Sequence, residues 1–461
     1  MKLAVLGAGP GGYVAAIKAA QMGAQVAIIE DSEVGGTCLN WGCIPTKSIA
    51  ASVEILKKAK LSENFGIEIK GDVIPNLSKI IKRKNKVVEI QVKGIRNLFK
   101  SWGITLKEGR GMLISPREIE VTLKDGIKET IKADKIIIAT GSRPSQFPAF
   151  PFDGNSIISS DDAVNLKYIP KSLLIIGAGI IGCEFANIYK ELGSEVTILE
   201  MLPRALSTED VEISEQLEKE FKKKKINLYT NVKIDRLEAG NDGVHAKLPD
   251  GKEIVAEKAL VSTGRTFNSA GIGLETIGIN KDNNGKIIVN ENMETNVTGI
   301  YAVGDVIGGF MFAHVASREG IISAKNAMGY DEKINYNVVP VSIFTSPEIG
   351  SVGLREHQAS EKGINIKTGY FQFRVLSKAH IMGEFTGFIK IVSEESSDRI
   401  LGAHIIGPHA TELIHEAALA IKNGLKISDL SETIHAHPTL SEGLMEAAED
   451  VHGEAIHVFK K

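Results

Sequence analysis

KLAVLGAGPGGYVAAIKAAQMGAQVAIIE, residues 2–30, returns later in the chain as SLLIIGAGIIGCEFANIYKELGSEVTILE, residues 172–200. Each copy has an apolar run, a G-x-G-x-x-G turn, an apolar stretch of helical period and a second apolar run that ends in glutamate. The glutamate follows the first glycine by 23 residues in both copies, from 7 to 30 and from 177 to 200. One such glycine turn is a weak signal, but two complete strand–helix–strand units with equal spacing predict two Rossmann-like dinucleotide-binding domains.

Six glycines form the two turns, and each has a physical task. The first permits the tight turn, the second lets the backbone approach a pyrophosphate, and the third lets helix and strand pack closely. They are Gly7, Gly9 and Gly12 in the first copy and Gly177, Gly179 and Gly182 in the second. Glu30 and Glu200 end the second strands, where a carboxylate can accept a hydrogen bond from a ribose 2′-OH. The alternative is a pair of ordinary strand–helix–strand units.

Two further apolar strands, KIIIATGSRP (135–144) and ALVSTGRTFNS (259–269), stop at Thr-Gly and mark the ends of the two units. We therefore place boundaries at 143 and 265 and a third at 335. Residues 51–110 form an insertion whose basic segment 78–102 predicts a long helix with a solvated face. Residues 336–461 carry short strands and the helical TELIHEAALAIKNG without a glycine fingerprint, which is typical of an α+β domain.

Composition limits the classes of partner. The chain of 461 residues is 43% hydrophobic and 24% charged, with a net charge of −3. This gives no electrostatic reason to expect nucleic acid or an acidic membrane surface as partner. Three cysteines are too few for a secreted disulfide framework, no leader precedes the first strand, and no apolar run reaches the length of a membrane span. We expect a cytoplasmic protein of several domains.

GGTCLNWGCIPTKS, residues 35–48, holds two of the three cysteines, Cys38 and Cys43. The segment follows Glu30 closely, so it leaves the sheet edge where a bound dinucleotide lies. A zinc site would need four ligands, and Cys183 lies inside the second fingerprint helix as an expected core residue, so no metal is predicted. Two buried thiols and a redox disulfide both remain open. The position beside a dinucleotide favours the disulfide, and a helix starting here favours a thiolate.

At this segment the chain resembles the flavin-dependent pyridine nucleotide–disulfide oxidoreductases. The resemblance spans the whole chain, in the family's order, and includes GAGPGGYVAAIKAAQMG, ATGSRP, GAGIIGCEFA, GIYAVGDV, FTSPEIGSVG, LGAHIIGP and HAHPTLSE. Trp41 and TGRTFNS depart from the commoner family pattern. The resemblance implies FAD at the first fingerprint and NAD at the second. It also implies a central domain (266–335) that completes the FAD site, and an obligate homodimer assembled through the interface domain 336–461.

The resemblance assigns roles to single residues. Cys43 is expected against the flavin, Cys38 faces the substrate, and Lys47 lies near the flavin ring and pairs with Glu184. Further FAD contacts are expected from Glu30 at the adenosine ribose, Asp305 at the ribityl chain, and Gly111, Thr140, Gly141 and Ala313. NAD contacts are expected from Glu200, Val232 and Gly264. From the residues alone, Lys47 can equally be a surface lysine and Asp305 a turn aspartate. A carboxylate at 200 favours NAD over NADP, and Arg204 is the feature that keeps NADP open.

HAHPTLSE, residues 435–442, carries the candidate base. In the family pattern His437 is the base and Glu442 orients it, while His435 has a packing role. Thr439-x-x-Glu442 is also a capping-box pattern, so Glu442 can close a helix N-terminus, and both roles can hold together.

The implied activity is oxidation of protein-bound dihydrolipoamide to lipoamide with reduction of NAD⁺ to NADH through a Cys38–Cys43 disulfide. The implied partners are lipoyl domains of 2-oxoacid dehydrogenase or glycine-cleavage complexes. The alternatives are a glutathione- or mercuric-reductase-like enzyme of the same family and a non-catalytic, FAD-containing docking component.

Overall fold

The structure is a computed structural model that describes residues 1–458, so the last three residues of the predicted 336–461 domain lie outside it. The chain divides into two compact units. Unit 1 contains Met1–Gln146, Ser159–Tyr168 and Gly264–Ile334. Unit 2 contains Phe147–Ile158, Ile169–Thr263 and the chain from Asn335 onward. Each unit holds one glycine fingerprint.

Unit 1 is built on a seven-stranded sheet with the order β17-β6-β1-β2-β3-β4-β5. The strands from β17 to β3 pair in parallel, and β4 and β5 add an antiparallel hairpin. The strand bounds are β1 Lys2–Leu6, β2 Gln25–Glu30, β3 Thr105–Ser115, β4 Glu118–Leu123, β5 Lys128–Lys132, β6 Lys135–Ile138 and β17 Ile300–Ala302. A small antiparallel pair joins β7 (Ser142–Pro144) to β16 (Arg265–Phe267).

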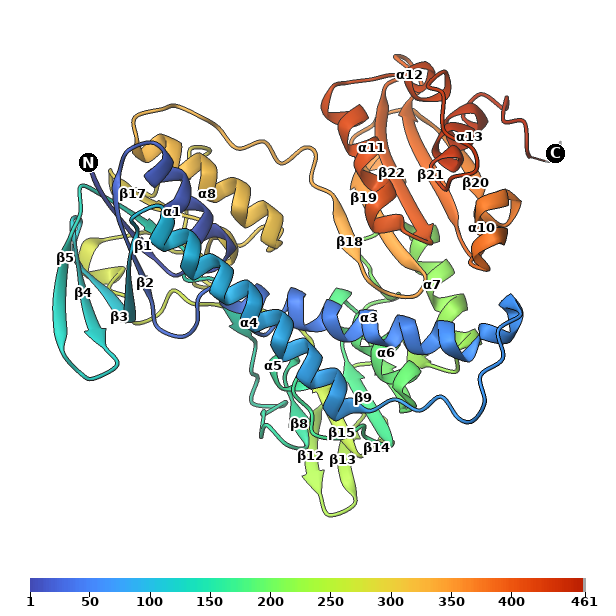
Figure 1. Cartoon of the computed structure of the whole chain (residues 1–461), viewed down its shortest axis with the longest axis horizontal. Helices are drawn as coiled ribbons and strands as arrows, with labels where there is room; N and C mark the ends of the chain where they lie inside the picture. The colour runs from blue at the N-terminus through green and yellow to red at the C-terminus, as the bar shows by residue number, and fades with distance from the viewer. Residues whose placement is uncertain (459–461) are drawn as a thin grey trace. The chain divides into compact units, whose positions relative to one another are not determined.

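Helices α1 (Pro10–Gln21) and α8 (Ala313–Ala327) lie side by side in unit 1 (Figure 1). A second helical layer contains α2 (Gly36–Asn40), α3 (Cys43–Lys60) and α4 (Leu77–Ser101), and α4 confirms the predicted long helix. The Asn76 side chain caps α4 by accepting from the Lys79 amide. Short helices complete the unit, namely α5 Ser160–Ala163, η1 Ser62–Phe65, η2 Glu275–Ile277 and η3 Gly304–Ile307.

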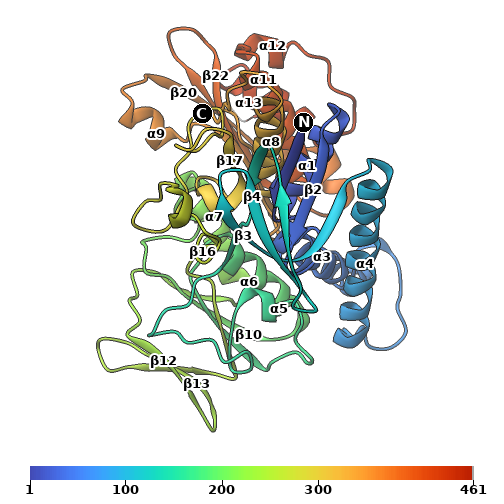
Figure 2. The same cartoon turned by 90° about the vertical axis from the view of Figure 1, so that its left-hand side faces the viewer.

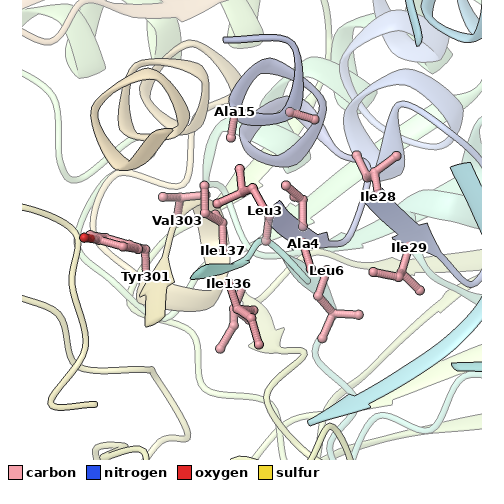
Figure 3. Packing of buried hydrophobic residues seen from close by; sticks show 14 of the residues in the cluster. Leu3, Ala4, Leu6, Ala15, Ile28, Ile29, Ile136, Ile137, Tyr301 and Val303 are labelled. Carbon is pink, nitrogen blue, oxygen red and sulfur yellow. The ribbon is translucent and has the colours of Figure 1, made fainter. Parts of the chain in front are cut away.

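The central strands of unit 1 are continuous runs of apolar residues because both faces of the sheet are buried in the core. Parallel strands covered on both faces have no solvent side and so no polar alternation. Figure 3 shows side chains of β1, β2 and β6 gathered beneath Ala15 of α1. Leu3, Ile28 and Ile137 are all buried there.

Unit 2 contains the second nucleotide fold, a five-stranded parallel sheet with the order β11-β10-β9-β15-β8. Its strands are β8 Ile157–Ile158, β9 Ser172–Ile176, β10 Glu195–Leu199, β11 Asn227–Tyr229 and β15 Lys258–Val261. Its helices are α6 Ile180–Leu192 and α7 Val211–Lys223. An antiparallel sheet of β12 Arg236–Gly240, β13 Gly243–Lys247 and β14 Glu253–Ala256 is attached, and Figure 2 shows β12 and β13 as a hairpin.

The rest of unit 2 is an antiparallel sheet with the order β18-β19-β22-β21-β20, so the predicted α+β texture of this region is confirmed. The strands are β18 Val341–Ile343, β19 Glu348–Gly353, β20 Ile366–Gln372, β21 Phe388–Glu394 and β22 Ile400–Gly407. The helices are α9 Glu356–Glu361, α10 Ser377–Met382, α11 Ala410–Lys422, α12 Ile427–Ser431, α13 Glu442–Asp450 and the short η4 Phe373–Val375. Helix α11 packs on β19 and β22, and α13 packs on β20 and β21.

The two fingerprint turns are built alike. Gly7 and Gly177 have φ angles of +102° and +100°, a region that a side chain rarely tolerates. A Cβ on Gly12 would lie 1.9 Å from the Gly7 carbonyl oxygen, and one on Gly182 would lie 2.0 Å from the Gly177 carbonyl oxygen. The middle glycine of the second turn, Gly179, has open space around it. The fold therefore requires the first and third glycines. No packing contact requires the middle one, which agrees with its expected role of letting the backbone approach a pyrophosphate.

The close contact in the second turn predicts a difference between Gly182→Ala and Gly179→Ala. The Gly182→Ala methyl group has no room, so we expect this variant to lose about 1–3 kcal/mol of unfolding free energy, as overpacked sites do. Gly179→Ala is expected to lose less than half as much, because only backbone preference at a helix start opposes it. Urea unfolding of both variants measures the difference. Equal losses would contradict the proposed steric origin.

Candidate active site and nucleotide sites

Three helices begin at the predicted nucleotide sites, and none of them has a side-chain cap. They are α1 behind Gly9, α8 behind Phe312 and α6 behind Gly179. Side chains cap some other helices, such as α4 and α7, while others, such as α10 and α11, also lack a side-chain cap. Uncapped amides at a helix start leave hydrogen-bond donors and positive dipole ends for an anion. Ala313, predicted to contact FAD, is the first residue of α8.

Glu30 is placed where the fingerprint turn of unit 1 needs a hydrogen-bond acceptor. Its carboxylate accepts from the Ala8 amide at 2.7 Å and from the Ser32 amide at 2.9 Å. Burial raises the pKa of Glu30, and the two backbone hydrogen bonds act in the opposite direction. Each carboxylate oxygen has a second lone pair, so the group can still accept from a ribose hydroxyl.

Asp305, in η3, belongs to a polar cluster that the sequence did not reveal. Its carboxylate accepts from the Ser142 hydroxyl at 2.5 Å, and the Arg265 Nε lies 3.7 Å from it. Arg265 also donates to the Ser142 hydroxyl at 2.7 Å and to the Ser142 carbonyl at 2.9 Å. Burial raises the pKa of Asp305, while the Ser142 hydrogen bond and the charge of Arg265 lower it. Ser142 and Arg265 each follow a Thr-Gly strand end, and the β7–β16 pairing brings them together.

The remaining predicted FAD contacts lie in the same unit. The Thr140 hydroxyl donates to the Asn268 carbonyl at 2.8 Å, and the Gly141 carbonyl accepts from the Asn268 amide at 2.9 Å. Gly111 lies inside β3, where a Cβ would meet the Leu6 side chain at 2.5 Å. The packing of β3 therefore already explains a glycine at this position, and its contact with FAD stays a prediction.

The cysteine segment rests directly on the first fingerprint turn. The Gly35 amide donates to the Ala8 carbonyl at 2.8 Å, and a Cβ on Gly36 would meet the Gly9 Cα at 2.7 Å. Cys38 lies in α2, and Cys43 is the first residue of α3, as the predicted helix start requires. The backbone contacts fix α2 against the turn that an anion would occupy.

Cys38 and Cys43 interact with each other through their side chains. The hydrogen bond with Cys43 and then burial raise the pKa of the Cys38 thiol, and the positive charge of Lys47 opposes them. Tyr13 of α1 is also close, because the Cys38 charge adds to the burial that raises the Tyr13 pKa. The two thiols are therefore neighbours, and the charge of Lys47 acts on Cys38 from nearby. Cys183 is fully buried, as predicted for a core residue, and burial raises its pKa.

The second fingerprint repeats the carboxylate arrangement of the first. Glu200 accepts from the Ala178 amide at 2.6 Å and from the Leu202 amide at 2.7 Å, and its carbonyl accepts from the Val232 amide. Arg204 turns its guanidinium to the carbonyls of Ser207 and Glu209, at 2.8 and 3.1 Å. Arg204 is thus engaged in holding its own loop. Gly264, the other predicted NAD contact, belongs to unit 1.

His437 and Glu442 form the predicted pair. The His437 Nδ1 lies 2.8 Å from one Glu442 oxygen, and the Thr439 amide donates to the other at 2.7 Å. Glu442, the first residue of α13, therefore binds the Thr439 backbone and contacts the imidazole at once, although α13 itself has no side-chain cap. Burial acts to raise the pKa of Glu442, but the Thr439 and His437 hydrogen bonds bring it below its usual value. The His437 side chain is 70% exposed, which leaves its other nitrogen accessible.

The competing histidine is held differently. His435 Nε2 lies 2.9 Å from Glu416, its Nδ1 lies 2.7 Å from the Thr433 carbonyl, and its side chain is only 5% exposed. Both ring nitrogens are occupied, in agreement with the predicted packing role. Glu184 is buried in α6 and accepts from the Phe344 amide at 2.9 Å. Lys47 and Glu184 belong to different units, and their pairing stays a prediction.

Comparison with known proteins places this site in a family. Residues 1–320 match the pyridine nucleotide-disulphide oxidoreductases, and residues 339–448 match the dimerisation domain of that family. The chain is therefore a member of the pyridine nucleotide-disulphide oxidoreductase family. Curated relatives named dihydrolipoyl dehydrogenase are 44% identical over 444 residues in Chlamydia pneumoniae and 42% identical over 467 residues in Bacillus subtilis. These alignments cover 96% of this chain and 95% of the first relative, and 98% of both chains for the second.

Solved structures match the fold of the chain along nearly its whole length. The crystal structure of LpdA from Mycobacterium tuberculosis matches with a TM-score of 0.92 at 29% identity, over 97% of this chain and 99% of that one. The HOCl-induced flavoprotein disulfide reductase RclA from Escherichia coli matches with a TM-score of 0.87 at 27% identity, over 97% and 99%. The predicted fold class, the predicted oxidoreductase class and the FAD and NAD(H) cofactors of the family are thereby confirmed. The chain also carries the family's dimerisation domain, in support of a homodimer. None of the helices between residues 1 and 458 is long and apolar enough to cross a membrane.

The two hydrogen bonds of Glu442 predict a pH-dependent loss of stability in Glu442→Ala. Losing the hydrogen bond from the Thr439 amide is expected to cost about 1 kcal/mol at pH 7. The folded-state pKa of Glu442 is lowered, so its contribution is full above the ordinary glutamate value of about 4.3 and is lost as pH falls through the folded-state pKa. Urea unfolding at pH 7 and in acid measures this.

His437→Ala is the matched control, because the exposed imidazole is expected to contribute within about 0.5 kcal/mol. A Glu442→Ala loss that stays constant down to strongly acidic pH, or one that His437→Ala reproduces, would contradict this assignment.

Proposed function

We propose that this protein is an FAD-dependent oxidoreductase that oxidises protein-bound dihydrolipoamide to lipoamide and reduces NAD⁺ to NADH. Near full-length relatives named dihydrolipoyl dehydrogenase support the activity. The observation that carries the chemistry is the Cys38–Cys43 pair, whose side chains share a hydrogen bond on the first fingerprint turn. A cysteine pair held against a dinucleotide-binding turn supports electron exchange between the two thiols and the bound dinucleotide.

The thiol steps follow from the chain's own residues. His437 accepts a proton from one thiol of dihydrolipoamide, and the resulting thiolate attacks the Cys38 sulfur of an oxidised Cys38–Cys43 disulfide. The disulfide opens, Cys43 leaves as a thiolate, and the substrate is joined to Cys38. The second substrate thiol, once deprotonated, attacks the first substrate sulfur. Lipoamide leaves with its own disulfide, and the protein keeps two electrons as the reduced pair.

The residues around the first fingerprint fit FAD. The uncapped starts of α1 and α8 offer amides to a pyrophosphate, Glu30 offers an acceptor to a ribose, and the buried Asp305 carboxylate offers one to a polyol chain. Held by these residues, FAD would supply the redox chemistry that links the dithiol to NAD⁺, as acceptor of two electrons and donor of hydride. Cys43, at the start of α3, and the nearby Lys47 charge favour a thiolate facing that cofactor. Lys47 pairs with Glu184 in this proposal.

The second fingerprint fits NAD(H) better than NADP(H). Glu200 places a negative charge where a 2′-phosphate would sit, and Val232 lies beside it in hydrogen-bond contact. Arg204, the cation that could accept such a phosphate, is bound to two carbonyls of its own loop. Gly264 completes the contacts on the nicotinamide side in this proposal.

The four-domain division belongs to the same proposal. Residues 1–143 bind FAD, 144–265 bind NAD, 266–335 complete the FAD site and 336–461 form the interface of an obligate homodimer in which His437 and Glu442 serve the partner subunit's disulfide. The grouping of Gly264–Ile334 with the first fingerprint and the dimerisation-domain match over 339–448 support it. The natural partners are cytoplasmic multienzyme complexes that present dihydrolipoyl groups on lipoyl domains.

A second candidate is reduction of a different disulfide on the same scaffold. The similarity to the flavoprotein disulfide reductase RclA favours it, because that protein shares the fold along nearly the whole chain. His437 and Glu442 suit any dithiol or disulfide substrate. A docking component without catalysis would have no use for the Cys38–Cys43 pair.

The proposed substrate is tested by comparing dihydrolipoamide, glutathione disulfide and Hg²⁺ with NAD(H) and NADP(H). We expect dihydrolipoamide with NAD⁺ to exceed every other pair. His437→Gln is expected to lower dihydrolipoamide turnover by about 10²–10⁴-fold, the usual contribution of a general base, and to leave reduction of the flavin by NADH within about twofold. NADH is expected to induce a long-wavelength absorbance from a thiolate–flavin pair in the wild-type protein, and Cys43→Ser is expected to abolish it. Equal losses in both half-reactions of His437→Gln would overturn its role on the substrate side.

Cofactor choice gives a second test, in Glu200→Ser. Removing the carboxylate takes away the acceptor for a 2′-OH and two hydrogen bonds of the turn, so kcat/KM for NAD⁺ is expected to fall about tenfold or more, that is, by at least about 1.4 kcal/mol. Activity with NADP⁺ is expected to stay below that with NAD⁺, because Arg204 remains bound to its loop. Strong NADP⁺ activity in Glu200→Ser would show that Arg204 is recruited to the phosphate.

A further inference from the structure

Residues 200–210 form the loop that joins β10 to α7, and we call it the ribose loop because it begins at Glu200. The loop wraps the second fingerprint turn, since the Ala178 amide donates to Glu200 and the Ala178 carbonyl accepts from Leu206 at 2.9 Å. Ala205 is buried, and its amide donates to Glu218 of α7 at 2.9 Å. The position of Glu200 thus depends on how the whole loop is held.

The far end of the ribose loop carries two buried carboxylates, Glu209 and Asp210. The Arg355 Nη2 donates to both oxygens of Glu209 at 3.0 Å. The Lys390 Nζ donates to Asp210 at 3.0 Å and is itself 99% buried, with a relative exposure of 1%. Asp210 also caps α7 by accepting from the Glu212 amide.

Both cations come from a different part of the chain than the loop they bind. Arg355 lies between β19 and α9, and Lys390 lies in the middle of β21. Both belong to residues 339–448, which match the family's dimerisation domain. Lys390 is fixed in turn by Glu212 at 2.8 Å and by Glu356 at 2.7 Å. Buried ion pairs with several hydrogen bonds hold one geometry, because breaking one leaves an uncompensated charge in the interior.

We propose that Arg355 and Lys390 are positioning residues for the nicotinamide cofactor. They act from the dimerisation domain through Glu209 and Asp210, and they hold the ribose loop so that Glu200 faces the adenosine ribose of NAD(H). The inference rests on the proposed function only in taking the second fingerprint as the NAD(H) site. It adds that the affinity of this site is set in part by residues of another domain that do not touch the cofactor.

The test uses the FAD-containing protein with Arg355→Gln and Lys390→Met, each of which leaves a buried carboxylate without its cation. We expect Kd for NADH and KM for NAD⁺ to rise by about 3- to 30-fold, the range over which such networks change coupling. The kcat at saturating NAD⁺ and the rate at which dihydrolipoamide reduces the flavin without NAD⁺ are expected to stay within about twofold. An unchanged Kd for NADH in either folded variant overturns the role of that residue.

The matched control is Arg399→Gln, which removes a cation of the same domain whose carboxylate partner, Glu394, lies near the surface. It is expected to leave Kd for NADH unchanged, and an equal rise there overturns the proposal. The double variant Arg355→Gln/Glu209→Gln removes the unpaired charge. We expect it to reverse at least half of the increase in log Kd for NADH that Arg355→Gln causes. If Arg355→Gln does not fold, Arg355→Lys replaces it and is expected to raise Kd by a smaller factor, and no rise overturns the proposal.

Two measurements, NADH binding and reduction of the flavin by dihydrolipoamide, distinguish a failure of this inference from a failure of the proposed function. NADH binding is measured on protein whose flavin and dithiol have first been fully reduced, so that bound NADH is not consumed, and the measurement needs no dihydrolipoamide. If dihydrolipoamide fails to reduce the wild-type flavin, the proposed substrate is wrong, while the Kd comparison still decides the role of Arg355 and Lys390. A matched fall in both half-reactions overturns the positioning role, because a general loss of structure would produce it.

Discussion

The close approach of a helix to the strand before it is the constraint on which the rest of this structure depends. Gly12 has no space for a Cβ against the Gly7 carbonyl, and Gly182 repeats the contact in the second turn. Only this approach brings the uncapped helix start to the sheet edge, where its amides can face a pyrophosphate. In unit 1 the same turn also supports the cysteine segment, through the hydrogen bond from Gly35 to Ala8. Nucleotide binding and thiol chemistry therefore share one piece of backbone.

Much of the fold and site could be predicted because the signals are local in sequence. The fingerprint spacing, the cysteine pair and the His437–Glu442 pair each lie within a short segment, and local geometry leaves them few arrangements. The capping box expected from Thr439-x-x-Glu442 is only half formed, because the Thr439 hydroxyl donates to the Ala436 carbonyl and α13 has no side-chain cap. Glu442 uses one oxygen for the Thr439 amide and the other for His437, as the two oxygens of a carboxylate allow.

What the sequence did not reveal is assembled from distant segments. Ser142 meets Asp305 across 163 residues and Arg265 across 123, and only the pairing of β7 with β16 makes them neighbours. The Lys390–Asp210 contact spans 180 residues. A lysine in the apolar strand GFIKIV gives no local sign of its partners, because Asp210 and Glu212 lie outside the dimerisation domain and Glu356 lies 34 residues away within it.

The two strand-end glutamates show how the geometry of each nucleotide site is fixed by the backbone as well as by the ligand. Glu30 and Glu200 each accept the amide of the alanine inside the glycine turn and a second amide just beyond the strand. These backbone bonds orient the carboxylate before any ribose arrives, so little ordering remains to be done on binding. The same bonds mean that the side chain which selects the cofactor also holds the turn that binds its pyrophosphate. A substitution of Glu30 or Glu200 is therefore expected to change both the choice of nucleotide and the geometry of the glycine turn.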